Sequence, residues 1–252
     1  MALLDRTDLI GNLFFPRTDE APTPADATDY AVAVSGASLH LRVHAGPSSA
    51  GMVLMFHGNG EIVSDWNAAA SDFSEHGFRL AVVDYRGYGQ STGTPTIRTL
   101  LSDANAVLDY VAATFAAPLV VMGRSLGSAA AWEAIAHAAQ RHRVRGVVID
   151  SGFVSVDAFA QRRGLAPQAI DADARRALDP MPKLAAVTCP VLLLHGEQDA
   201  AIAITEAVAA FDALACPKQL VRLAGRGHND LSWHPDYWAK LGAFLHQCKA
   251  AD

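Results

Sequence analysis

The chain of 252 residues has only three cysteines, Cys189, Cys216 and Cys248. Their number is odd, they lie far apart, and no two of them have the C-x-x-C spacing. A disulfide framework needs cysteines in pairs, and zinc sites use closely spaced ligands, so the sequence predicts neither. Because scarce cysteines without a pairing pattern favour a reducing compartment, we expect a cytoplasmic protein.

Positive charge is also scarce, with 20 Lys and Arg against 26 Asp and Glu and a net charge of −6. No basic stripe stands out, so the sequence lacks the electrostatic footprint of nucleic-acid-binding proteins. No apolar run reaches the roughly 18 residues that a membrane span needs. The first residues do not combine a basic stretch with an apolar one, as a secretory signal does. We expect no nucleic-acid partner and no membrane insertion.

What the sequence does contain is typical of a globular protein with a large core. Apolar residues make up 51% of the chain and charged residues 18%, which excludes an intrinsically disordered chain. The 19 glycines and 12 prolines are too few for a collagen-like or linker sequence. The length fits a single α/β domain.

Short apolar runs of strand length recur along the chain. Those at 52–56 and 191–195 are apolar at nearly every position, as in strands that are covered on both faces. The alternating run at 39–44 is typical of an antiparallel edge strand. The expected strands are Tyr30–Val34, Leu39–His44, Met52–Phe56, Leu80–Asp84, Leu119–Met122, Gly146–Ile149, Val191–His195 and Gln219–Leu223.

Segments of helix length separate these strands. Strands that alternate with helices predict a mostly parallel, eight-stranded type of sheet with helices on both faces. In such sheets ligands bind beyond the carboxyl ends of the strands, so motifs at strand ends carry the most functional weight. The expected helices are Ile62–His76, Ile97–Phe115, Ser125–Arg141, Ile204–Leu214 and Tyr237–Cys248.

Two stretches depart from this alternation. Residues 1–29 include Arg17–Asp29, which is rich in Pro, Thr, Asp and Ala, and they predict an extended lead-in to a domain at 30–252. Phe153–Val187 contains no strand-like run. We interpret it as a small helical cap, inserted after the sixth strand and lying over the strand ends.

The strongest chemical signal is Gly123-Arg124-Ser125-Leu126-Gly127, which matches G-x-S-x-G between an apolar strand and an Ala-rich helix. So tight a turn forces its central residue into a strained backbone conformation, and glycines are needed where a Cβ would collide with the backbone. The turn lifts the hydroxyl of Ser125 above the sheet edge. It predicts a nucleophile; in the alternative interpretation the serine only caps the helix.

A serine hydroxyl is a weak nucleophile that needs a base within hydrogen-bond reach. His228 stands in a glycine-flanked loop just after the last expected strand, from which its imidazole can reach Ser125. His234 is the rival, although Pro235 follows it and no glycine flanks it. We predict His228 as the base.

The base in turn needs an acid that fixes its tautomer and stabilises the imidazolium. Asp199 comes after the expected strand Val191–His195, and His228 comes after the next expected strand. We predict Asp199 as this acid. Glu197 is the alternative in the same loop, and Asp150 at the end of the sixth strand is a third. The chain order of nucleophile, acid and base is the one expected for this architecture.

Attack on a carbonyl group creates an oxyanion that backbone N–H groups can stabilise. One donor is expected to be the N–H of Leu126, next to the nucleophile. The other is expected to be the N–H of Asn59, because Gly58 and Gly60 allow the backbone of that loop to approach a ligand closely. We interpret His57 as a structural residue that supports the loop.

The motifs together resemble the α/β-hydrolase superfamily, and in particular its small-capped serine hydrolases of the esterase, depalmitoylase-like and prolyl-oligopeptidase-like groups. The resemblance covers about residues 30–246 and implies the α/β-hydrolase fold, with Ser125, Asp199 and His228 as the catalytic residues and Asn59 and Leu126 as oxyanion donors. It rests on Phe56-His57-Gly58-Asn59-Gly60, Asp84-Tyr85-Arg86-Gly87-Tyr88-Gly89-Gln90-Ser91, Gly123-Arg124-Ser125-Leu126-Gly127, His195-Gly196-Glu197-Gln198-Asp199 and Gly227-His228-Asn229-Asp230.

Further residues are candidates for substrate binding. Glu61 and Arg124 are expected to lie near the nucleophile in the fold and could contact a polar substrate group, although solvated charges at the rim are the simpler interpretation. Phe153 and Trp233 could line an acyl pocket, and Gly58 and Gly60 would border it. The run Asp84–Ser91 is interpreted as scaffold, with its arginine, Arg86, in a structural ion pair.

We therefore expect a serine hydrolase that cleaves carboxylic esters, or thioesters, of small to medium acyl groups through an acyl-Ser125 intermediate. The expected partner is a small-molecule ester, and no metal and no organic cofactor is expected. A peptidase or amidase with the same residues is the nearer alternative, and a non-catalytic binding protein on this fold is the more distant one. The sequence makes no prediction of the oligomeric state.

Overall fold

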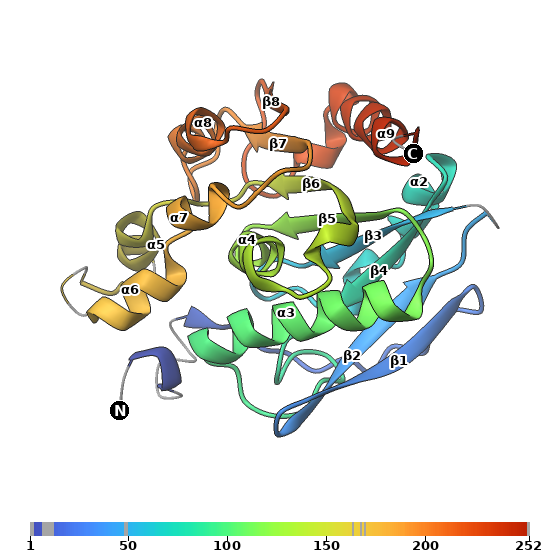
Figure 1. Cartoon of the computed structure of the whole chain (residues 1–252), viewed down its shortest axis with the longest axis horizontal. Helices are drawn as coiled ribbons and strands as arrows, with labels where there is room; N and C mark the ends of the chain where they lie inside the picture. The colour runs from blue at the N-terminus through green and yellow to red at the C-terminus, as the bar shows by residue number, and fades with distance from the viewer. Residues whose placement is uncertain are drawn as a thin grey trace.

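The computed structural model describes residues 3–6, 13–47, 50–162, 164–166, 168 and 170–250. Its centre is a single eight-stranded sheet with the strand order β1-β2-β4-β3-β5-β6-β7-β8 (Figure 1). The strands are β1 (Ala27–Val34), β2 (Ala37–His44), β3 (Gly51–Phe56), β4 (Phe78–Val83), β5 (Leu119–Arg124), β6 (Val144–Asp150), β7 (Val191–Gly196) and β8 (Lys218–Leu223).

The sheet is mostly parallel, as the sequence predicts. From β4 to β8 all neighbouring strands run parallel, whereas β2 runs antiparallel to both β1 and β4. The antiparallel direction of β2 is therefore confirmed, but its expected place at the edge of the sheet is wrong. β1 pairs with it along eight positions, from Ala27 with His44 to Val34 with Ala37, and so forms the edge.

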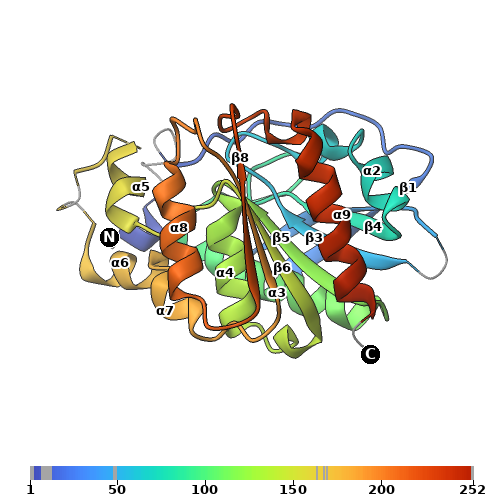
Figure 2. The same cartoon turned by 90° about the horizontal axis from the view of Figure 1, so that it is seen from above.

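Helices cover both faces of the sheet (Figure 2). In this view α3, α4 and α8 lie on one side of the sheet and α2 and α9 on the other. The α-helices are α2 (Ala70–Glu75), α3 (Ile97–Thr114), α4 (Gly127–His137), α5 (Val156–Arg162), α6 (Ala172–Leu178), α7 (Met181–Leu184), α8 (Ile204–Ala213) and α9 (Pro235–Ala250). The short 3₁₀ turns are η1 (Leu3–Asp5), η2 (Val63–Trp66), η3 (Arg141–Arg143) and η5 (Leu231–Trp233).

Two expected helices differ from the observed ones. The segment expected as one helix at 62–76 is divided into η2 and α2, because the carboxylate of Asp65 accepts a hydrogen bond from the N–H of Ile62 and closes a separate 3₁₀ turn. The helix expected to reach Arg141 ends at His137, after which η3 leads into β6.

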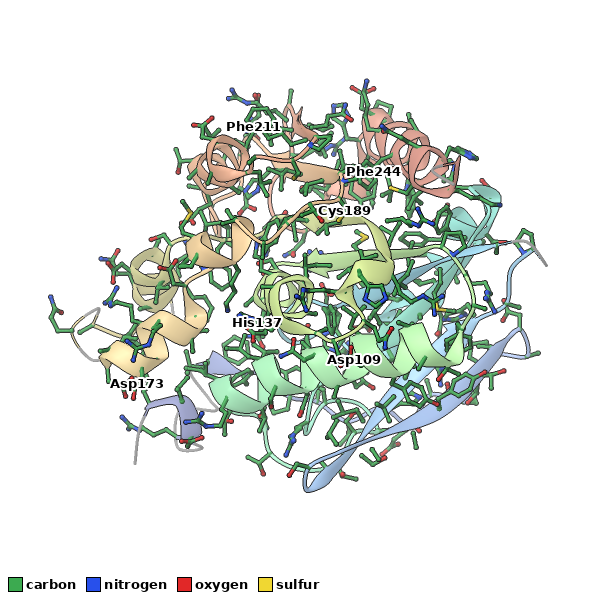
Figure 3. All side chains as sticks on the ribbon, viewed as in Figure 1. Asp109, His137, Asp173, Cys189, Phe211 and Phe244 are labelled. Carbon is green, nitrogen blue, oxygen red and sulfur yellow. The ribbon has the colours of Figure 1, made fainter. Side chains whose placement is uncertain are left out.

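The apolar runs that predict the strands form the core. β3 and β7 are buried at every position, since helices cover them on both faces. One apolar cluster includes the residues between the sheet and α3, α4 and α8, and a second lies under α2 and α9. In Figure 3, which draws the side chains, Phe211 marks α8 and Phe244 marks α9. Within the described residues no helix is long and apolar enough to span a bilayer.

The segment between β6 and β7 forms the small helical cap that the sequence predicts. It contains α5, α6 and α7, which lie at one end of the molecule in Figure 1. α6 contacts α3, and α7 contacts α4 and α8. The N-terminal residues pack nearby, because Leu13 and Phe14 are buried in the core and η1 contacts α3 and α6. Residues 1–2 and 7–12 of the expected lead-in lie outside the described part, and its boundary at residue 29 stays a prediction.

Candidate active site

Ser125 occupies a tight turn between β5 and α4. Its backbone φ is +50°, in the left-handed region that non-glycine residues rarely adopt, so the predicted strain is confirmed. The flanking glycines allow close packing: a Cβ at Gly127 would lie 2.0 Å from the carbonyl oxygen of Phe56, and one at Gly123 would lie 2.6 Å from that of Gly127. The turn thus packs directly on the end of β3 and presents the serine at the carboxyl edge of the sheet.

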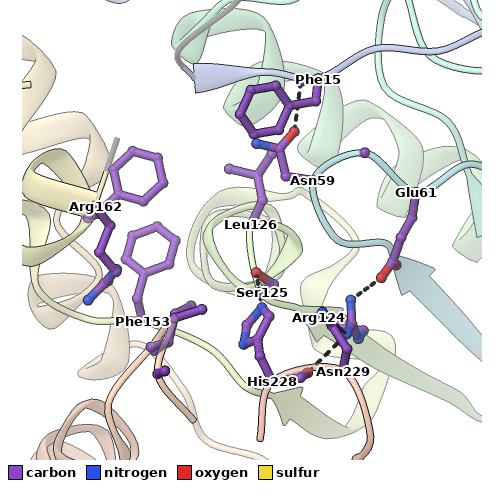
Figure 4. Close-up of a pocket in the computed structure, with 15 residues that line it drawn as sticks. Phe15, Asn59, Glu61, Arg124, Ser125, Leu126, Phe153, Arg162, His228 and Asn229 are labelled. Carbon is purple, nitrogen blue, oxygen red and sulfur yellow. Dashed lines mark hydrogen bonds and ion pairs between the residues drawn. The ribbon is translucent and has the colours of Figure 1, made fainter. Parts of the chain in front are cut away.

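Three distant side chains meet above this edge. The Nε2 atom of His228 lies 2.9 Å from Oγ of Ser125, and its Nδ1 atom lies 2.7 Å from Oδ2 of Asp199. In the tautomer that satisfies both contacts, Nδ1–H donates to the carboxylate and Nε2 accepts from the hydroxyl. The structure therefore brings together the three residues that the strand-end motifs single out. Figure 4 shows two of them, Ser125 and His228.

Asp199 is held as a carboxylate on the far side of the imidazole. Its Oδ1 atom accepts hydrogen bonds from the N–H groups of Ala201 (2.9 Å) and Ile202 (2.7 Å). Burial alone would raise the pKa of Asp199, but the hydrogen bonds from His228 and from the backbone of Ile202 hold that pKa below its usual value. Asp199 thus keeps its charge and holds the imidazole of His228 by the bond to Nδ1.

The alternative residues lie elsewhere. Nδ1 of His234 accepts from the N–H of Asp236, and Glu197 forms an exposed ion pair with Arg222. The hydroxyl of Tyr237 donates to Asp150 at 2.8 Å. Burial raises the pKa of Asp150, although the nearby guanidinium of Arg124 opposes the shift.

A cavity of about 530 Å³ opens over Ser125. The predicted site residues that line it include the nucleophile, the base and both expected oxyanion residues. Its lining consists of Phe15, Asn59, Gly60, Glu61, Arg124, Ser125, Leu126, Phe153, Phe159, Arg162, Ala200, Ala201, Ile202, His228 and Asn229.

Two residues expected at the substrate do not line this cavity. Trp233 is 74% exposed and belongs to a separate cavity of about 340 Å³, because η5 carries the chain away behind the His228 loop. Gly58 lies beneath the cavity wall, where its N–H donates to Oε2 of Glu61. The structure therefore does not place Gly58 or Trp233 at the expected substrate site.

Both expected oxyanion donors border the cavity. Within the described part of the chain, the backbone N–H groups of Leu126 and Asn59 donate to no protein acceptor, and both residues line the cavity. The side chain of Asn59 ties its loop to the N-terminal segment. Its Nδ2 donates to the carbonyl of Leu13, and its Oδ1 accepts from the N–H of Phe15 and the hydroxyl of Tyr88.

Glu61 and Arg124 are not the solvated rim charges of the simpler interpretation. They pair with each other, and their side chains are only 22% and 12% exposed. Arg124 also donates from Nη2 to the carbonyl oxygen of His228 (3.1 Å) and to Oδ1 of Asn229 (2.8 Å). The pair therefore joins the loop after β3 to the loop of the base.

The run Asp84–Ser91 is scaffold, as the sequence predicts. Arg86 forms a bidentate ion pair with Asp103, in which Nε and Nη2 lie 2.6 and 2.8 Å from the two carboxylate oxygens. The fully buried His57 lies against the ring of Tyr85, whose hydroxyl donates to the carbonyl oxygen of His57. These contacts support the loop that carries Asn59.

Seven lining residues are not among the predicted site residues. Ala200, Ala201, Ile202 and Asn229 belong to the loops of Asp199 and His228, and the other three are Phe15, Phe159 and Arg162. Phe15 was included in the lead-in, and the other two belong to a cap whose helices could not be placed. The only signal for Phe159 and Arg162 was their spacing of three residues, which puts two side chains on one face if the segment is helical.

Comparisons with known proteins agree with this architecture. A family model described as "Serine aminopeptidase, S33" matches residues 47–169, which is slightly less than half of the chain. The uncharacterized protein YfhR of Salmonella typhimurium is 30% identical over 228 residues, covering 83% of this chain and 77% of YfhR. The α/β-hydrolase domain-containing protein 17C of Mus musculus is 27% identical over 215 residues, covering 81% of this chain and 62% of that relative.

Among solved structures, the esterase Pf2001 of Pyrococcus furiosus is similar in fold. It superposes with a TM-score of 0.74 at 17% identity, covering 93% of this chain and 99% of the esterase. The fold, the strand-end motifs and the similarity to YfhR and its relatives lead to one assignment. The chain belongs to the α/β-hydrolase superfamily.

Proposed function

We propose that this protein is a serine hydrolase that cleaves carboxylic esters of small to medium acyl groups through an acyl-Ser125 intermediate. The observation that carries the proposal is the unbroken hydrogen-bonded line from Asp199 through His228 to Ser125, at 2.7 and 2.9 Å, which ends in an open cavity. A line of this kind activates a hydroxyl that is otherwise a poor nucleophile.

In the first half of the reaction, Oγ of Ser125 attacks the ester carbonyl carbon while Nε2 of His228 takes the hydroxyl proton. The tetrahedral intermediate collapses, the bond to the leaving oxygen breaks, and His228 returns the proton to the departing alcohol. In the second half, water gives a proton to His228 and attacks the acyl carbon. Collapse releases the carboxylic acid and restores the hydroxyl of Ser125.

The negative charge of each tetrahedral intermediate would be stabilised by the N–H groups of Leu126 and Asn59. Their lack of protein acceptors within the described residues, together with their place at the cavity, supports this role. Removing one such donor from a serine hydrolase costs about 3 to 4 kcal/mol of transition-state stabilisation. Asp199 would stabilise the imidazolium form of His228 that arises at each step.

The choice of esters rests on similarity rather than on the three polar residues, which serve esters, thioesters and amides alike. The similar structure of Pf2001 is that of an esterase. The description of the matching family model as a serine aminopeptidase favours amides and makes an amidase the second candidate. That model ends at residue 169, before Asp199 and His228, so it covers only the nucleophile half of the site.

The first test is labelling by a fluorophosphonate probe, which reacts only with an activated serine. The native protein is expected to be labelled and the Ser125→Ala variant is not. Absence of labelling in the native protein would favour a non-catalytic binding protein on the same fold.

The substrate class is tested with matched esters, thioesters and amides of one acyl group. We expect kcat/KM to be highest for the ester. A series of p-nitrophenyl esters should reach its maximum at short or medium acyl chains, and a maximum beyond twelve carbons would overturn the expected size preference.

A further inference from the structure

We propose that the preferred acyl group carries a carboxylate at its far end, so that the substrate is a half-ester of a dicarboxylic acid, and that Arg162 binds this carboxylate. The inference rests on the proposed function and specifies its substrate class. It follows from how the cap helix α5 contributes to the cavity over Ser125.

The α5 helix presents two different side chains to this cavity. Phe159 and Arg162 stand three residues apart, on one face of the helix, and both line the cavity that contains Ser125. The ring of Phe159 stacks on that of Phe153, with centroids 4.6 Å apart and planes 14° from parallel. In Figure 4 the side chain of Phe153 lies between Ser125 and Arg162. The wall from the nucleophile toward the cap is therefore apolar and ends at a guanidinium group.

Arg162 keeps most of its hydrogen-bonding capacity. Among the described residues its guanidinium makes one hydrogen bond, a long one of 3.4 Å from Nη1 to Oε1 of Glu206, with which it also forms an ion pair. Glu206 is buried and is held in place by the backbone, because its Oε2 accepts hydrogen bonds from the N–H groups of Val154 and Ser155 at 2.8 Å each. Glu206 thus occupies one edge of the guanidinium, and the remaining N–H donors are available to a ligand.

The other permanent charges of the cavity cancel. Glu61 and Arg124 form an ion pair, and the second guanidinium nitrogen of Arg124 is used by the carbonyl of His228 and by Asn229. Of the two arginines that line the cavity, Arg162 is therefore the one whose N–H donors are mostly unused within the described residues. A planar carboxylate that accepts two parallel N–H bonds is the group that best matches such a donor edge.

An uncharged acyl chain gains nothing from this arrangement. It would cover the guanidinium of Arg162 and remove water from it without replacing the lost hydrogen bonds. A carboxylate at the right distance replaces them and adds a charge–charge interaction. Because a site built for hydrogen bonds discriminates against ligands that lack the partner, we expect about a 10- to 100-fold preference in kcat/KM.

The test compares pairs of substrates that differ only in charge. Monoethyl esters of succinic, glutaric, adipic and pimelic acid are set against the corresponding ethyl ω-amides, in which an amide replaces the carboxylate without changing the length. Ethanol release gives kcat/KM for each. We expect one chain length at which the native protein prefers the acid by about tenfold or more.

Substitutions of Arg162 assign the preference to this residue. In Arg162→Gln the ratio of acid to amide should fall to about one, and Arg162→Lys should keep part of it because the charge remains without the fork geometry. Arg176→Gln is the matched control, since Arg176 belongs to the cap but is 75% exposed at its side chain and pairs with Asp173. The control should keep the native ratio.

A measurement on the unaltered protein covers the case in which the variants fail to fold. The free dicarboxylate of the preferred length should inhibit competitively, and the monocarboxylate of equal length should bind at least about tenfold more weakly. Equal inhibition by both acids, or equal kcat/KM for acids and amides at every length, overturns the proposal. If no ester is hydrolysed and no probe labels Ser125, it is the proposed function that fails.

Discussion

The guanidinium of Arg124 donates from Nη2 to the backbone carbonyl oxygen of His228 at 3.1 Å. Through Nη1 the same group pairs with Glu61, whose carboxylate in turn accepts a hydrogen bond from the N–H of Gly58 at 2.8 Å. The residue that precedes Ser125 is therefore attached to the loop of His228 and to the loop of Asn59. We regard Arg124 as a positioning residue that fixes both loops relative to Ser125.

Replacing Arg124 tests this role. In Arg124→Met we expect kcat for a neutral ester to fall about 10- to 100-fold with KM little changed, because small displacements of the base and the oxyanion donors slow the chemical step. Arg124→Lys should recover part of kcat. The control is Arg98→Met, since Arg98 forms an exposed ion pair with Asp5. A rise in KM at constant kcat would instead make Arg124 a substrate-binding residue.

A second prediction separates the two buried aspartates near the strand ends. In Asp199→Asn the carboxylate that accepts from Nδ1 of His228 is lost, and we expect kcat to fall by about 10³- to 10⁴-fold. In Asp150→Asn the amide replaces a carboxyl group whose pKa burial already raises, so we expect a loss of less than about tenfold. Steady-state kinetics of both variants decide the matter, and the reverse order would make Asp150 the acid.

The positions of Ser125, Asp199 and His228 could be predicted because each lies within five residues after the end of a strand, namely β5, β7 and β8. Parallel strands place their carboxyl ends at one edge of the sheet, so residues 74 and 29 positions apart in sequence meet there. The same argument placed the loop of Asn59. The strands can be recognised from short stretches of sequence. The connection rules for parallel sheets then leave few possible topologies, and these bring the strand ends together.

The wall of the cavity could not be predicted in the same way. Whether Trp233 lines the cavity over Ser125 depends on which way the chain leaves the His228 loop, and η5 places it at the neighbouring cavity instead. The position of Phe15 at the cavity could not be predicted, because the residues around it show no periodic pattern that indicates where the segment packs. The pairing of Glu61 with Arg124 is a contact between residues 63 positions apart, and charge patterning reveals no such pair.

A third prediction concerns the side chain of Asn59, which ties the loop of the expected oxyanion donor to Leu13 and Phe15. In Asn59→Ala the backbone N–H remains, but the bonds that orient it are lost. We expect kcat to fall about tenfold, with KM changed less. Tyr88→Phe removes one bond to Asn59 and one from the N–H of Phe15, but it leaves the bonds of Asn59 with Leu13 and Phe15 and should have a smaller effect. Unchanged kcat in Asn59→Ala would show that the loop is held without this side chain.

The last prediction concerns acid stability and the buried carboxylate of Asp84. Burial by itself would raise the pKa of Asp84, but the hydrogen bonds from His40 and the N–H of Val63, together with the nearby imidazole of His57, lower it to about 2. In the unfolded chain the pKa of an aspartate is about 4. The ionised form is thus favoured by folding, so its contribution is complete above about pH 4 and is lost as the pH falls toward 2.

Asp84→Asn should therefore lower the free energy of unfolding by about 2 kcal/mol at neutral pH, and the difference from the native protein should shrink between about pH 4 and 2. Denaturant unfolding at a series of pH values measures both quantities. Asp72→Asn is the contrasting variant, because burial and the nearby Glu75 raise the pKa of Asp72, so losing that charge should not destabilise the fold at neutral pH. A difference for Asp84→Asn that stays constant down to pH 2 would mean that packing, rather than the charge of Asp84, provides the stabilisation.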